Sequence, residues 1–574
     1  MPDPAAILTT RLQAAMAAAL GPEFADADPV LRPSQHADFQ ANAAMALAKK
    51  LGRPPRDVAT AIADALDVSG VASSVEVAGP GFLNITLDDG LLASLVVAGP
   101  VVDAGVAPET VVVDYSSPNA AKEMHVGHLR STVIGDSLVR VLEFLGHRVI
   151  RQNHLGDWGT QFGMLIEHLA ESGIDPAAGG IGDLDVLYRE AKHRFDSDPA
   201  FADAARQRVV LLQSGDEETL ALWHQLIEES ERHFEEVYTQ LGVKLTRDDI
   251  RGESFYNPLL ESTVEELEAK GLTVVDEGAL CIYPPGFVGR DGSPFPLMVR
   301  KRDGGFGYDA TDLAGVRFRA RDLAGQRLVY VVDARQSQHF AMVFAASEMA
   351  GWLGAGSGSA ARAEHVAFGM VLGPDNRPFK TREGGTIRLR DLLNEAVERA
   401  GVVVADKSSD LSASEQSAVA RAVGIGAVKY ADLANDRVKD YVFDWDRMLS
   451  FEGNTAPYLQ YAHARIRSIF RRGGVAVPSG ARVVLAEPAE RALAMALLAF
   501  EPAVRLTADK LEPHRLCTYL FDLASAFTTF YEHCPVLRAE SPEVRDSRLV
   551  LCDLTARTLS VGLGLLGIEA PERM

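Results

Sequence analysis

Two histidines stand three residues apart where a strand-like run gives way to a helix-like one. His125 and His128 flank Gly127 in the segment VVVDYSSPNAAKEMHVGHLRS, which covers residues 111–131. A helix N-terminus offers unpaired backbone N–H groups and a partial positive charge, and glycine lets a flat base or a phosphate approach the backbone. Imidazole donors at this position could stabilise charge that develops on a transferring phosphoryl group, with Lys122 adding a full positive charge. Alternatively, the two histidines ligate a metal or simply cap the helix.

The residues around this motif predict a parallel sheet that holds the motif at its edge. Val111 to Tyr115 is an apolar, β-branched run typical of a buried strand, and residues 148–152 can form the next strand. The intervening helix has one apolar face, formed by Ile134, Leu138, Val141 and Leu145. Further strands are predicted at 328–332 and 366–372, so the core is expected to be a doubly wound parallel sheet of the α/β class. Ligands of such sheets bind at the carboxyl ends of the strands.

Three domains are predicted along the chain. Residues 1–105 form a small α+β unit, in which two helices precede a hairpin around Gly79-Pro80-Gly81. The first of these helices has an apolar face at four-residue spacing, formed by Leu8, Leu12 and Met16. Residues 106–445 contain the sheet and a more charged, helical insertion at about 176–290. Residues 446–574 are expected to be an all-α bundle, with apolar residues at four- and three-residue steps, namely Leu516, Leu520, Leu523, Phe527 and Phe530.

The bulk composition is that of a folded, multidomain protein. The 574 residues exceed the usual size of one domain, and the 47% hydrophobic and 24% charged residues leave no room for a long disordered tract. The four cysteines form no C-x-x-C pair, which argues against a zinc site and a disulfide framework. Neither a secretion signal nor an apolar run of about 20 residues is present, so a cytoplasmic location is expected.

The net charge of −22 argues against a protein that coats nucleic acid non-specifically, because that mode of binding needs clustered Lys and Arg. Local basic surfaces are still present in the C-terminal part, at Arg465, Arg467, Arg471 and Arg472, and at Lys510, His514 and Arg515. A solvated helix face is the alternative interpretation of each of these clusters.

The strand–loop–H-V-G-H–helix arrangement resembles the HIGH signature of class I aminoacyl-tRNA synthetases, whose catalytic core is Rossmann-like. The longer string, with D-Y-S-S-P-N and A-K-E-M before the histidines, resembles the arginyl-tRNA synthetase family. The segment GHRVIRQNHLGDWGTQFG at residues 146–163 is similar to the same family. The resemblance implies that His125, His128 and Lys122 are catalytic and that the first two contact ATP, together with Gly127, Gly156, Asp157, Met370 and Val371.

A second motif of this class is a loop that brings a cation to the ATP phosphates. The segment PFKTREGG at residues 378–385 resembles the KMSKS loop, although Lys380 is its only lysine. The resemblance implies a catalytic and ATP-binding Lys380 and an ATP-binding Arg382, and we expect Lys122 to supply the charge of the missing lysine. The alternative for this segment is an ordinary exposed turn.

Arginine presents a planar, permanently charged fork of five donors, which a carboxylate can bind through two parallel hydrogen bonds. Tyr308 and Asp312 are four residues apart, so both point from one face if the segment is helical. They resemble the Tyr-x-x-x-Asp pair of the family's arginine pocket, although Ala310 replaces a common threonine; a solvated helix start is the alternative. The resemblance adds further arginine contacts, namely Asp114, Ser117, Asn119 and Gln336.

The resemblance implies an enzyme that activates L-arginine with ATP and Mg²⁺ and then transfers the arginyl group to the terminal adenosine of tRNA(Arg). Activation in such families tends to need bound tRNA. The C-terminal bundle resembles an anticodon-binding domain, with Tyr458, Tyr461 and Arg465 as tRNA contacts. Helix packing is the alternative for both tyrosines. The N-terminal unit resembles the additional domain that meets the tRNA elbow, where Phe82 and Asn84 are candidate contacts.

Other class I enzymes with H-x-G-H are the nearest alternatives, such as cysteinyl- or glutaminyl-tRNA synthetases or smaller nucleotidyltransferases. Cysteinyl enzymes would need zinc-binding cysteines, so we expect no structural metal here. A paralogue that binds tRNA without catalysis is a third alternative, against which the intact histidines and the Tyr308/Asp312 pair argue. We expect a monomer that has no membrane partner.

Overall fold

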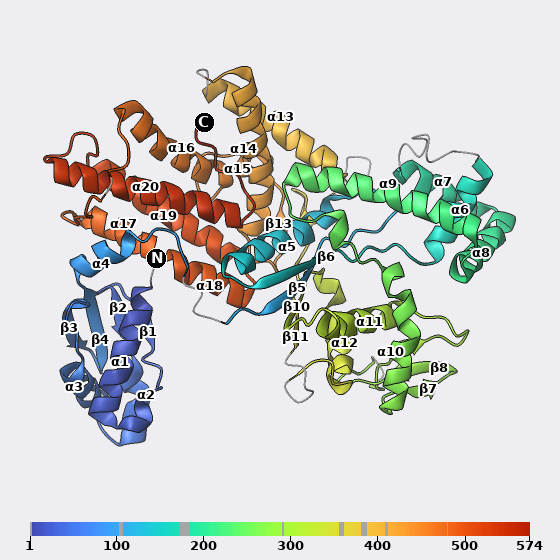
Figure 1. The fold of residues 1–574 in the computed structure, drawn as a ribbon, viewed down its shortest axis with the longest axis horizontal. Coiled ribbons are helices and arrows are strands. Elements are labelled where there is room, and N and C mark those ends of the chain that lie inside the picture. The colour runs from blue at the N-terminus through green and yellow to red at the C-terminus, as the bar shows by residue number, and fades with distance from the viewer. Residues whose placement is uncertain are drawn as a thin grey trace.

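We describe a computed structural model of the chain for residues 3–102, 107–172, 184–289, 292–354, 361–379, 387–407, 411–478 and 480–574. Figure 1 shows the N-terminal unit beside the helices of the C-terminal bundle, with the parallel strands in the middle of the molecule. The inserted helices α6 to α9 extend to the opposite end from the N-terminal unit. The parallel strands therefore lie between the insertion on one side and, on the other, the N-terminal unit and the C-terminal bundle, which were both expected to hold tRNA.

The N-terminal unit is an antiparallel sheet of order β1-β2-β4-β3 covered by helices. Its elements are α1 (Pro4–Leu20), β1 (Leu31–Pro33), β2 (Phe39–Ala41), α2 (Ala43–Leu51), α3 (Pro55–Ala65), β3 (Ala72–Ala78), β4 (Phe82–Leu87) and α4 (Asp89–Val96). The predicted helical face is confirmed, because Leu8, Leu12 and Met16 are all buried. The predicted hairpin is confirmed as β3 and β4, and the alternating burial along β4 leaves Phe82 and Asn84 on its outer face.

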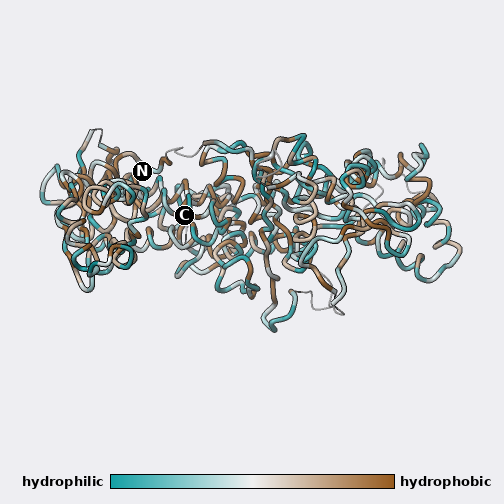
Figure 2. Tube along the Cα trace, turned by 90° about the horizontal axis from the view of Figure 1, so that it is seen from below, coloured by the Kyte–Doolittle hydropathy of each residue, from teal (hydrophilic) through white to brown (hydrophobic). Residues whose placement is uncertain are grey.

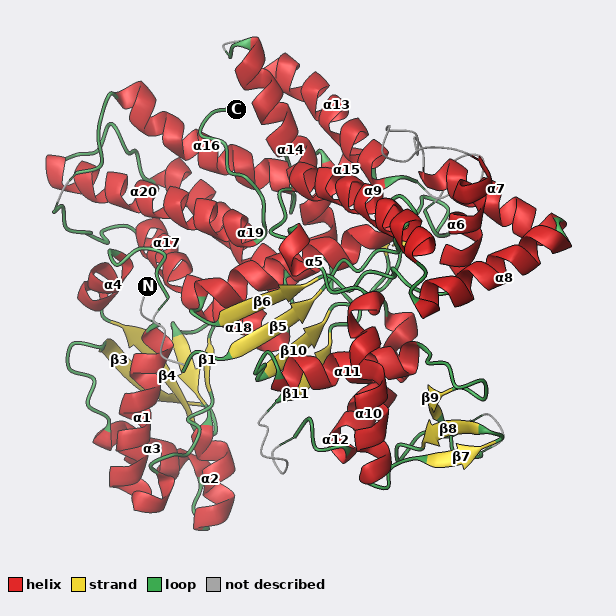
Figure 3. Ribbon diagram, turned by 45° about the vertical axis from the view of Figure 1, so that its right-hand side comes forward, coloured by secondary structure: helices red, strands yellow, loops and turns green. Residues whose placement is uncertain are grey.

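The predicted parallel sheet is confirmed, with the order β11-β10-β5-β6 and parallel pairing throughout. Its strands are β5 (Thr110–Asp114), β6 (Arg148–Gln152), β10 (Arg327–Tyr330) and β11 (Arg362–His365). Alternate residues of β5 face opposite layers: Val111 and Val113 pack in the core shared with α5 (Val126–Phe144), whereas Val112 packs with α11 (Tyr308–Arg321) and α12 (Ser337–Met349). Figure 3 shows these helices on the two sides of the strands. An apolar strand covered on both faces explains the unbroken valine run.

One strand prediction is wrong in its position. Residues 366–372 were expected to form a strand, but the fourth strand of the sheet is β11, which ends at His365. Only β12 (Val371–Leu372) is strand within the expected range, and it pairs with β13 (Tyr441–Val442) outside the main sheet. Val366, Phe368 and Val371 are nevertheless buried. A short apolar run therefore indicated burial correctly, because burial alone does not distinguish a sheet strand from an extended buried segment.

The insertion contains more than helices. Between the halves of the sheet lie α6 (Thr160–Ser172), α7 (Leu184–Ser197), α8 (Pro199–Ser214), α9 (Glu217–Leu241) and α10 (Asn257–Ala269). The expected all-helical range, however, includes β7 (Val274–Asp276) and β8 (Ala279–Ile282), which pair with β9 (Leu297–Arg300) in an antiparallel sheet. Because β7 and β8 are short and bounded by turns, the charged residues that predicted a helical insertion did not indicate these two strands.

The predicted helical character of residues 446–574 is confirmed, and long helices at 389–407 and 413–433 already precede this range. The helices are α13 (Leu389–Lys407), α14 (Ala413–Leu433), α15 (Trp445–Met448), α16 (Ala456–Gly473), α17 (Pro488–Leu498), α18 (Phe500–Lys510), α19 (His514–His533) and α20 (Pro542–Leu565). The apolar residues predicted at four- and three-residue steps are all buried on α19. The body of α5 contacts α14, α18 and α20, so the helix that begins at the histidines also packs against this bundle.

Hydrophobic residues are distributed along every part of the trace (Figure 2). They gather in several separate buried clusters, of which the largest joins the N-terminal unit, one face of the parallel sheet and the C-terminal helices. Within the described ranges, no helix combines the length and the apolar character needed to cross a membrane.

Candidate functional site

The loop between β5 and α5 is held in an unusual backbone conformation. Ser116, Ser117 and Ala121 have φ angles of 73°, 47° and 61°, although none of them is glycine. Left-handed conformations of such residues cost free energy and tend to occur at functional sites. A buried polar network holds this loop, because Ser116 Oγ and Asn153 Nδ2 both contact the hydroxyl of Tyr238 on α9, at 2.8 and 2.9 Å. The insertion therefore supports the loop that leads to the histidines.

The two histidines cap the N-terminus of α5 with their own side chains. The backbone N–H of Gly127 donates to His125 Nδ1 at 3.0 Å, and that of His125 donates to His128 Nδ1 at 3.1 Å. In a neutral imidazole the nitrogen that accepts a hydrogen bond carries no hydrogen, so the hydrogen of each ring must lie on Nε2. The ring centroids are 4.0 Å apart. The two rings thus provide two neighbouring Nε2–H donors at a helix N-terminus.

Burial keeps these imidazoles uncharged. Desolvation lowers the pKa of His125, with a further lowering by Lys122 that the carboxylate of Asp185 opposes. Desolvation and the neighbouring His125 lower the pKa of His128 to about 3. Both histidines are therefore neutral donors near pH 7, and they cannot act there as general acids that start from the imidazolium form.

Glycine is required between the histidines for a steric reason. A Cβ atom at Gly127 would lie 2.7 Å from Cε1 and 2.9 Å from Nδ1 of His125, closer than such atoms approach one another. Gly127 is also exposed, so the backbone there is open to a ligand. The ATP contact expected of Gly127 stays a prediction, but the ring of His125 already explains why a side chain would not fit.

The chain that follows the KMSKS-like segment lies beside this motif. There the N–H of Leu389 donates to Met124 O at 2.8 Å, and the N–H of Val126 donates to Ile387 O at 3.0 Å. At the start of the segment, the N–H of Phe379 donates to Val371 O of β12 at 3.1 Å. Lys380 and Arg382 themselves lie outside the described residues, and their ATP contacts stay predictions.

Three further residues expected at the ATP site have defined surroundings. Gly156 packs against Asn119, because a Cβ atom there would lie 2.3 Å from Asn119 Oδ1. Met370 is 36% exposed, and its N–H donates to Asp440 Oδ1 at 2.6 Å. Asp157 is buried, and its two carboxylate oxygens accept bonds from the N–H and the hydroxyl of Ser254 at 2.8 and 2.6 Å. Its ATP contact stays a prediction, but both of its oxygens already have protein partners.

Lys122 lies over an aromatic ring of the insertion. Its Nζ is 4.1 Å from the centroid of the Tyr188 ring on α7, which is a cation–π contact. Lys122 also lowers the pKa of both histidines, so its charge reaches the candidate phosphate site. That Lys122 supplies the positive charge of the lysine missing from the KMSKS-like segment stays a prediction.

The residues expected to hold the amino and carboxylate groups of arginine, Asp114, Ser117 and Asn119, lie at or just after the carboxyl end of β5, whereas Gln336, expected as a further polar contact, follows β10. Asp114 Oδ2 forms an ion pair with Arg319 Nη2 at 2.9 Å, and both side chains are buried. Ser117 Oγ donates to Asp114 Oδ1 at 3.1 Å. Asn119 is exposed and Gln336 is exposed at the end of a short 3₁₀ turn after β10. The ion pair with Arg319 is a feature that the motif did not indicate.

Tyr308 and Asp312 lie on the first turns of α11, as their spacing predicted. Both contact His339 of α12: its Nε2 is 2.6 Å from Asp312 Oδ2, and its ring centroid is 5.2 Å from that of Tyr308. Tyr308 is 69% exposed, so its ring is available to a ligand. The strands β5 and β10 are parallel neighbours, so the residues that follow both strands lie at one edge of the sheet.

A cavity of about 1110 Å³ lies beside this turn. The acids Asp309 and Glu253 line it, the second from the insertion, together with Tyr308 and the basic residues Lys301, Arg335 and His339. Burial, together with the charges of Asp157 and Asp312, raises the pKa of Glu253 to about 7. A cation in the cavity would relieve this repulsion. Sequence reasoning missed Glu253, because no motif marks it and only the fold brings it near Asp312.

The candidate tRNA contacts of the outer domains differ in their exposure. Tyr461 and Arg465 are exposed one turn apart on α16, and Arg465 lies over the ring of Tyr531 at 4.7 Å. Tyr458 is partly buried against Phe521, as the packing alternative suggested. Asn84 Oδ1 accepts a bond from Gln40 at 2.8 Å beside Phe82 on the outer face of β4. Their contacts with tRNA stay predictions.

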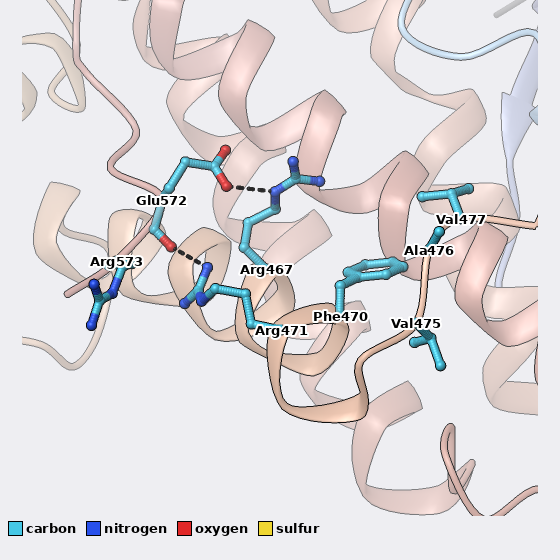
Figure 4. Close-up of a pocket in the computed structure, with 8 residues that line it drawn as sticks. All are labelled: Arg467, Phe470, Arg471, Val475, Ala476, Val477, Glu572 and Arg573. Carbon is cyan, nitrogen blue, oxygen red and sulfur yellow. Dashed lines mark hydrogen bonds and ion pairs between the residues drawn. The ribbon is translucent and has the colours of Figure 1, made fainter.

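A small cavity of about 300 Å³ lies at the end of α16 (Figure 4). Arg467 and Arg471 face the C-terminal segment there, with Arg467 Nε 2.8 Å from Glu572 Oε2 and Arg471 Nη1 donating to Glu572 O at 2.8 Å. These two arginines of the predicted basic cluster are therefore occupied by the chain's own C-terminal residues.

Comparisons with known proteins identify all three parts of the chain. Residues 93–445 match the model of the class I (R) tRNA synthetase catalytic domain, residues 6–87 the arginyl-tRNA synthetase N-terminal domain, and residues 459–574 the DALR anticodon-binding domain. The arginine–tRNA ligase of Thermobifida fusca is 55% identical over 100% of both chains, and that of Frankia casuarinae is 54% identical over 99% of both.

Two solved structures share the whole architecture. The arginyl-tRNA synthetase of Plasmodium falciparum superposes with a TM-score of 0.85 at 30% identity over 99% of both chains. That of Thermus thermophilus gives 0.81 at 29% identity, over 99% of this chain and 100% of the other. Since the three domain models, the full-length relatives and the superposed structures agree, the chain belongs to the arginyl-tRNA synthetase family.

Proposed function

We propose that this chain activates L-arginine with ATP and attaches it to the 3′-terminal adenosine of tRNA(Arg), at the carboxyl edge of its parallel sheet. One observation supports the proposal most directly. Two neutral Nε2–H donors at the start of α5 stand at the same sheet edge as a cavity lined in part by the acids Glu253 and Asp309, with Asp312 beside it. The first feature suits phosphate and the second suits a guanidinium.

Arginine is held through its guanidinium in this proposal. Asp312 and Glu253 accept hydrogen bonds from the fork, and Tyr308 covers its plane or accepts a further bond. Asp114, Ser117, Asn119 and Gln336 hold the α-amino and carboxylate groups, with Asp114 sharing its charge between the ammonium and Arg319. Lysine would leave several acceptors unpaired, and losses on the order of 10⁴-fold are reasonable for missing hydrogen bonds.

Activation then requires positioning and charge stabilisation. A carboxylate oxygen of arginine forms a bond to the α-phosphorus of ATP, the bond from that phosphorus to the bridging oxygen breaks, and pyrophosphate leaves. The Nε2–H groups of His125 and His128 donate to oxygens on which negative charge develops. Lys122 and Lys380 add positive charge, and the protein forms no covalent intermediate.

Mg²⁺ belongs to this proposal as a companion of ATP. Among the described residues, no group of three or more His, Cys, Asp or Glu side chains could hold a metal ion. Magnesium in such sites is bound largely by substrate phosphates and water. We therefore assign it no protein cage, and it would supply charge neutralisation on the phosphates when bound.

Transfer follows on the same edge of the sheet. A ribose hydroxyl of the terminal adenosine, the 2′-hydroxyl in class I chemistry, attacks the arginyl carbonyl, and AMP leaves. The enzyme is proposed to work as a monomer in the cytoplasm, and light scattering of the purified chain tests the first of these statements.

Pyrophosphate exchange with arginine, in the presence and absence of tRNA(Arg), tests the proposed function. Exchange that depends on arginine, and is absent with cysteine or glutamine, supports it. Absence of arginine-dependent exchange even with tRNA present would leave only the tRNA-binding paralogue as an interpretation.

Tyr461 and Arg465 are expected to contribute to tRNA binding. Stacking of a base on an aromatic ring contributes about 1–3 kcal/mol, so Tyr461→Ala should raise the KM for tRNA by roughly tenfold or more. Arg465→Ala should raise it as well and make it less sensitive to salt. The KM for arginine should stay unchanged. Arg482→Ala, at an exposed arginine outside α16, is the control, and an equal effect there would contradict the assignment.

The pKa of Glu253 predicts a pH dependence of arginine use. Because burial raises that pKa to about 7, the carboxyl group is largely protonated below this value and ionised above it. The kcat/KM for arginine should therefore rise with pH through about 7, since only the ionised form attracts the guanidinium. Glu253→Gln should lower kcat/KM at pH 8 and flatten this part of the profile. An unchanged profile in that variant would contradict the role of Glu253.

A further inference from the structure

His339 lies between two acids that share one turn of α11. Its Nε2 is 2.6 Å from Asp312 Oδ2, and its Nδ1 is 3.5 Å from Asp309 Oδ1. Resting on the proposed function, we propose that His339 is a positioning residue of the arginine pocket, which orients the carboxylate of Asp312 toward the guanidinium. No motif assigns this residue, which follows Gln336 by three positions.

The contacts form a chain from the β-sheet of the insertion to the pocket. The backbone N–H of Met298, on β9, donates to Asp309 Oδ2 at 2.8 Å. The other oxygen of Asp309 faces His339, and His339 faces Asp312. The chain of contacts therefore passes from Met298 on β9 to Asp309 on α11. It continues to His339 on α12 and returns to Asp312 on α11. The imidazole therefore has a carboxylate beside each nitrogen, with the hydrogen bond at Nε2.

Aromatic packing further restricts the ring of His339. The ring centroids of Tyr308 and Phe340 lie 5.2 and 5.4 Å away, both in edge-to-face geometry. Phe340 is buried and in turn contacts the ring of His365 at 5.2 Å. The side chain of His339 is only 18% exposed. A ring held on these sides presents its Nε2 to Asp312 in one direction.

Charge explains why a histidine suits this position. Asp309 and Asp312 are three residues apart on one helical face, where two carboxylates repel each other, and Asp312 also acts on nearby Glu253. An imidazole between them donates a hydrogen bond to Asp312 and offsets part of this repulsion. Each carboxylate oxygen has two lone pairs, so Asp312 can still accept the guanidinium while Oδ2 holds the imidazole. The bond selects one orientation of the carboxylate before arginine arrives.

The test compares His339→Phe with His339→Gln. Phenylalanine fills the aromatic cavity but donates no bond, so the KM for arginine should rise about 10- to 100-fold, the range expected for a bond to a charged group. The kcat and the KM for ATP should stay within about threefold of the wild-type values, since the phosphate site is separate. Glutamine can still donate a hydrogen bond to Asp312. On a logarithmic scale, the rise in arginine KM for His339→Gln should therefore be at most half of the rise for His339→Phe.

His365→Gln is the matched control, because it removes a partly buried histidine that touches the same Phe340 but neither acid. An arginine KM unchanged in His339→Phe, or raised equally in His365→Gln, would overturn the proposal. A double-mutant cycle with Asp309→Asn distinguishes this role from a general loosening of the fold. Asp309→Asn should raise the arginine KM in the wild type and have little further effect in His339→Phe. Additive effects of the two substitutions would also overturn the proposal.

Asp312→Asn, measured alongside, separates this inference from the proposed function. If Asp312→Asn leaves the arginine KM unchanged, the pocket assignment itself fails. If Asp312→Asn loses arginine use while His339→Phe keeps the wild-type KM, only the role of His339 fails. Thermal unfolding of each variant, which should keep the wild-type midpoint within a few degrees, checks that the fold is intact.

Discussion

Asp312→Ala is expected to abolish arginine-dependent pyrophosphate exchange while ATP binding is retained. The substitution removes the acceptor for two parallel hydrogen bonds from a guanidinium, and it leaves His339 without its closest charged partner. Losses on the order of 10³- to 10⁴-fold in kcat/KM for arginine follow from leaving such a fork unpaired. Steady-state exchange at varied arginine, with ATP binding followed separately, measures the effect.

Asp322→Asn is the control for this variant, since Asp322 is an exposed acid at the other end of α11. Its arginine KM should equal that of the wild type. Should Asp312→Ala retain the wild-type KM for arginine, the pocket assigned here would be wrong. A loss of ATP binding in Asp312→Ala would instead indicate a broader structural effect.

Removing either imidazole of the H-V-G-H motif should lower kcat with little change in the KM for arginine. Loss of one donor to developing negative charge typically costs about 10²- to 10³-fold in kcat, and His125→Ala and His128→Ala should each fall in this range. The double variant should lose less than the product of the two, because the rings are neighbours and each caps the backbone that positions the other.

The protonation state of these histidines gives the same prediction a second readout. Because the pKa of His128 lies at about 3, this ring does not titrate near pH 7. The pH profile of kcat in His128→Asn should therefore keep its shape between pH 6 and 8, at a lower level. A profile that loses an acidic limb in this variant would show that an imidazolium takes part. His147→Ala, at the opposite end of α5, should retain wild-type kcat and serves as the control.

Much of the architecture was predictable because its determinants are local. The four-residue spacing of Leu8, Leu12 and Met16 predicts α1, and the valines that precede Asp114 predict β5, since apolar periodicity depends on neighbours in the chain. The H-V-G-H motif is likewise contiguous, so its place at a helix N-terminus could be read before the structure. The tyrosine and the acid of α11 share a helical face for the same reason.

Prediction was weaker where two arrangements satisfy the same local pattern. The apolar residues around Val366 and Phe368 are buried whether they belong to a sheet strand or to an extended segment, so the strand was placed too late in the chain. The short strands β7 and β8 lie in a charged region that otherwise forms helices; they pair with each other, and β8 also pairs with β9, which lies beyond the expected insertion. Strand formation depends on packing against neighbouring strands, which a pattern of charged residues does not reveal.

By itself the sequence determined the class of the core, the domain order and most of the residues proposed to meet the phosphates and the guanidinium, because these depend on periodicity and on contiguous motifs. Only the tertiary structure decided that Glu253 approaches Asp157 and Asp312, that Asp114 is paired with Arg319, and that His339 lies between two acids. The physical reason is that hydrogen bonds, burial and shifted pKa values depend on distances between side chains from separate elements. Those distances exist only once α9, α11 and α12 have packed against the sheet and one another.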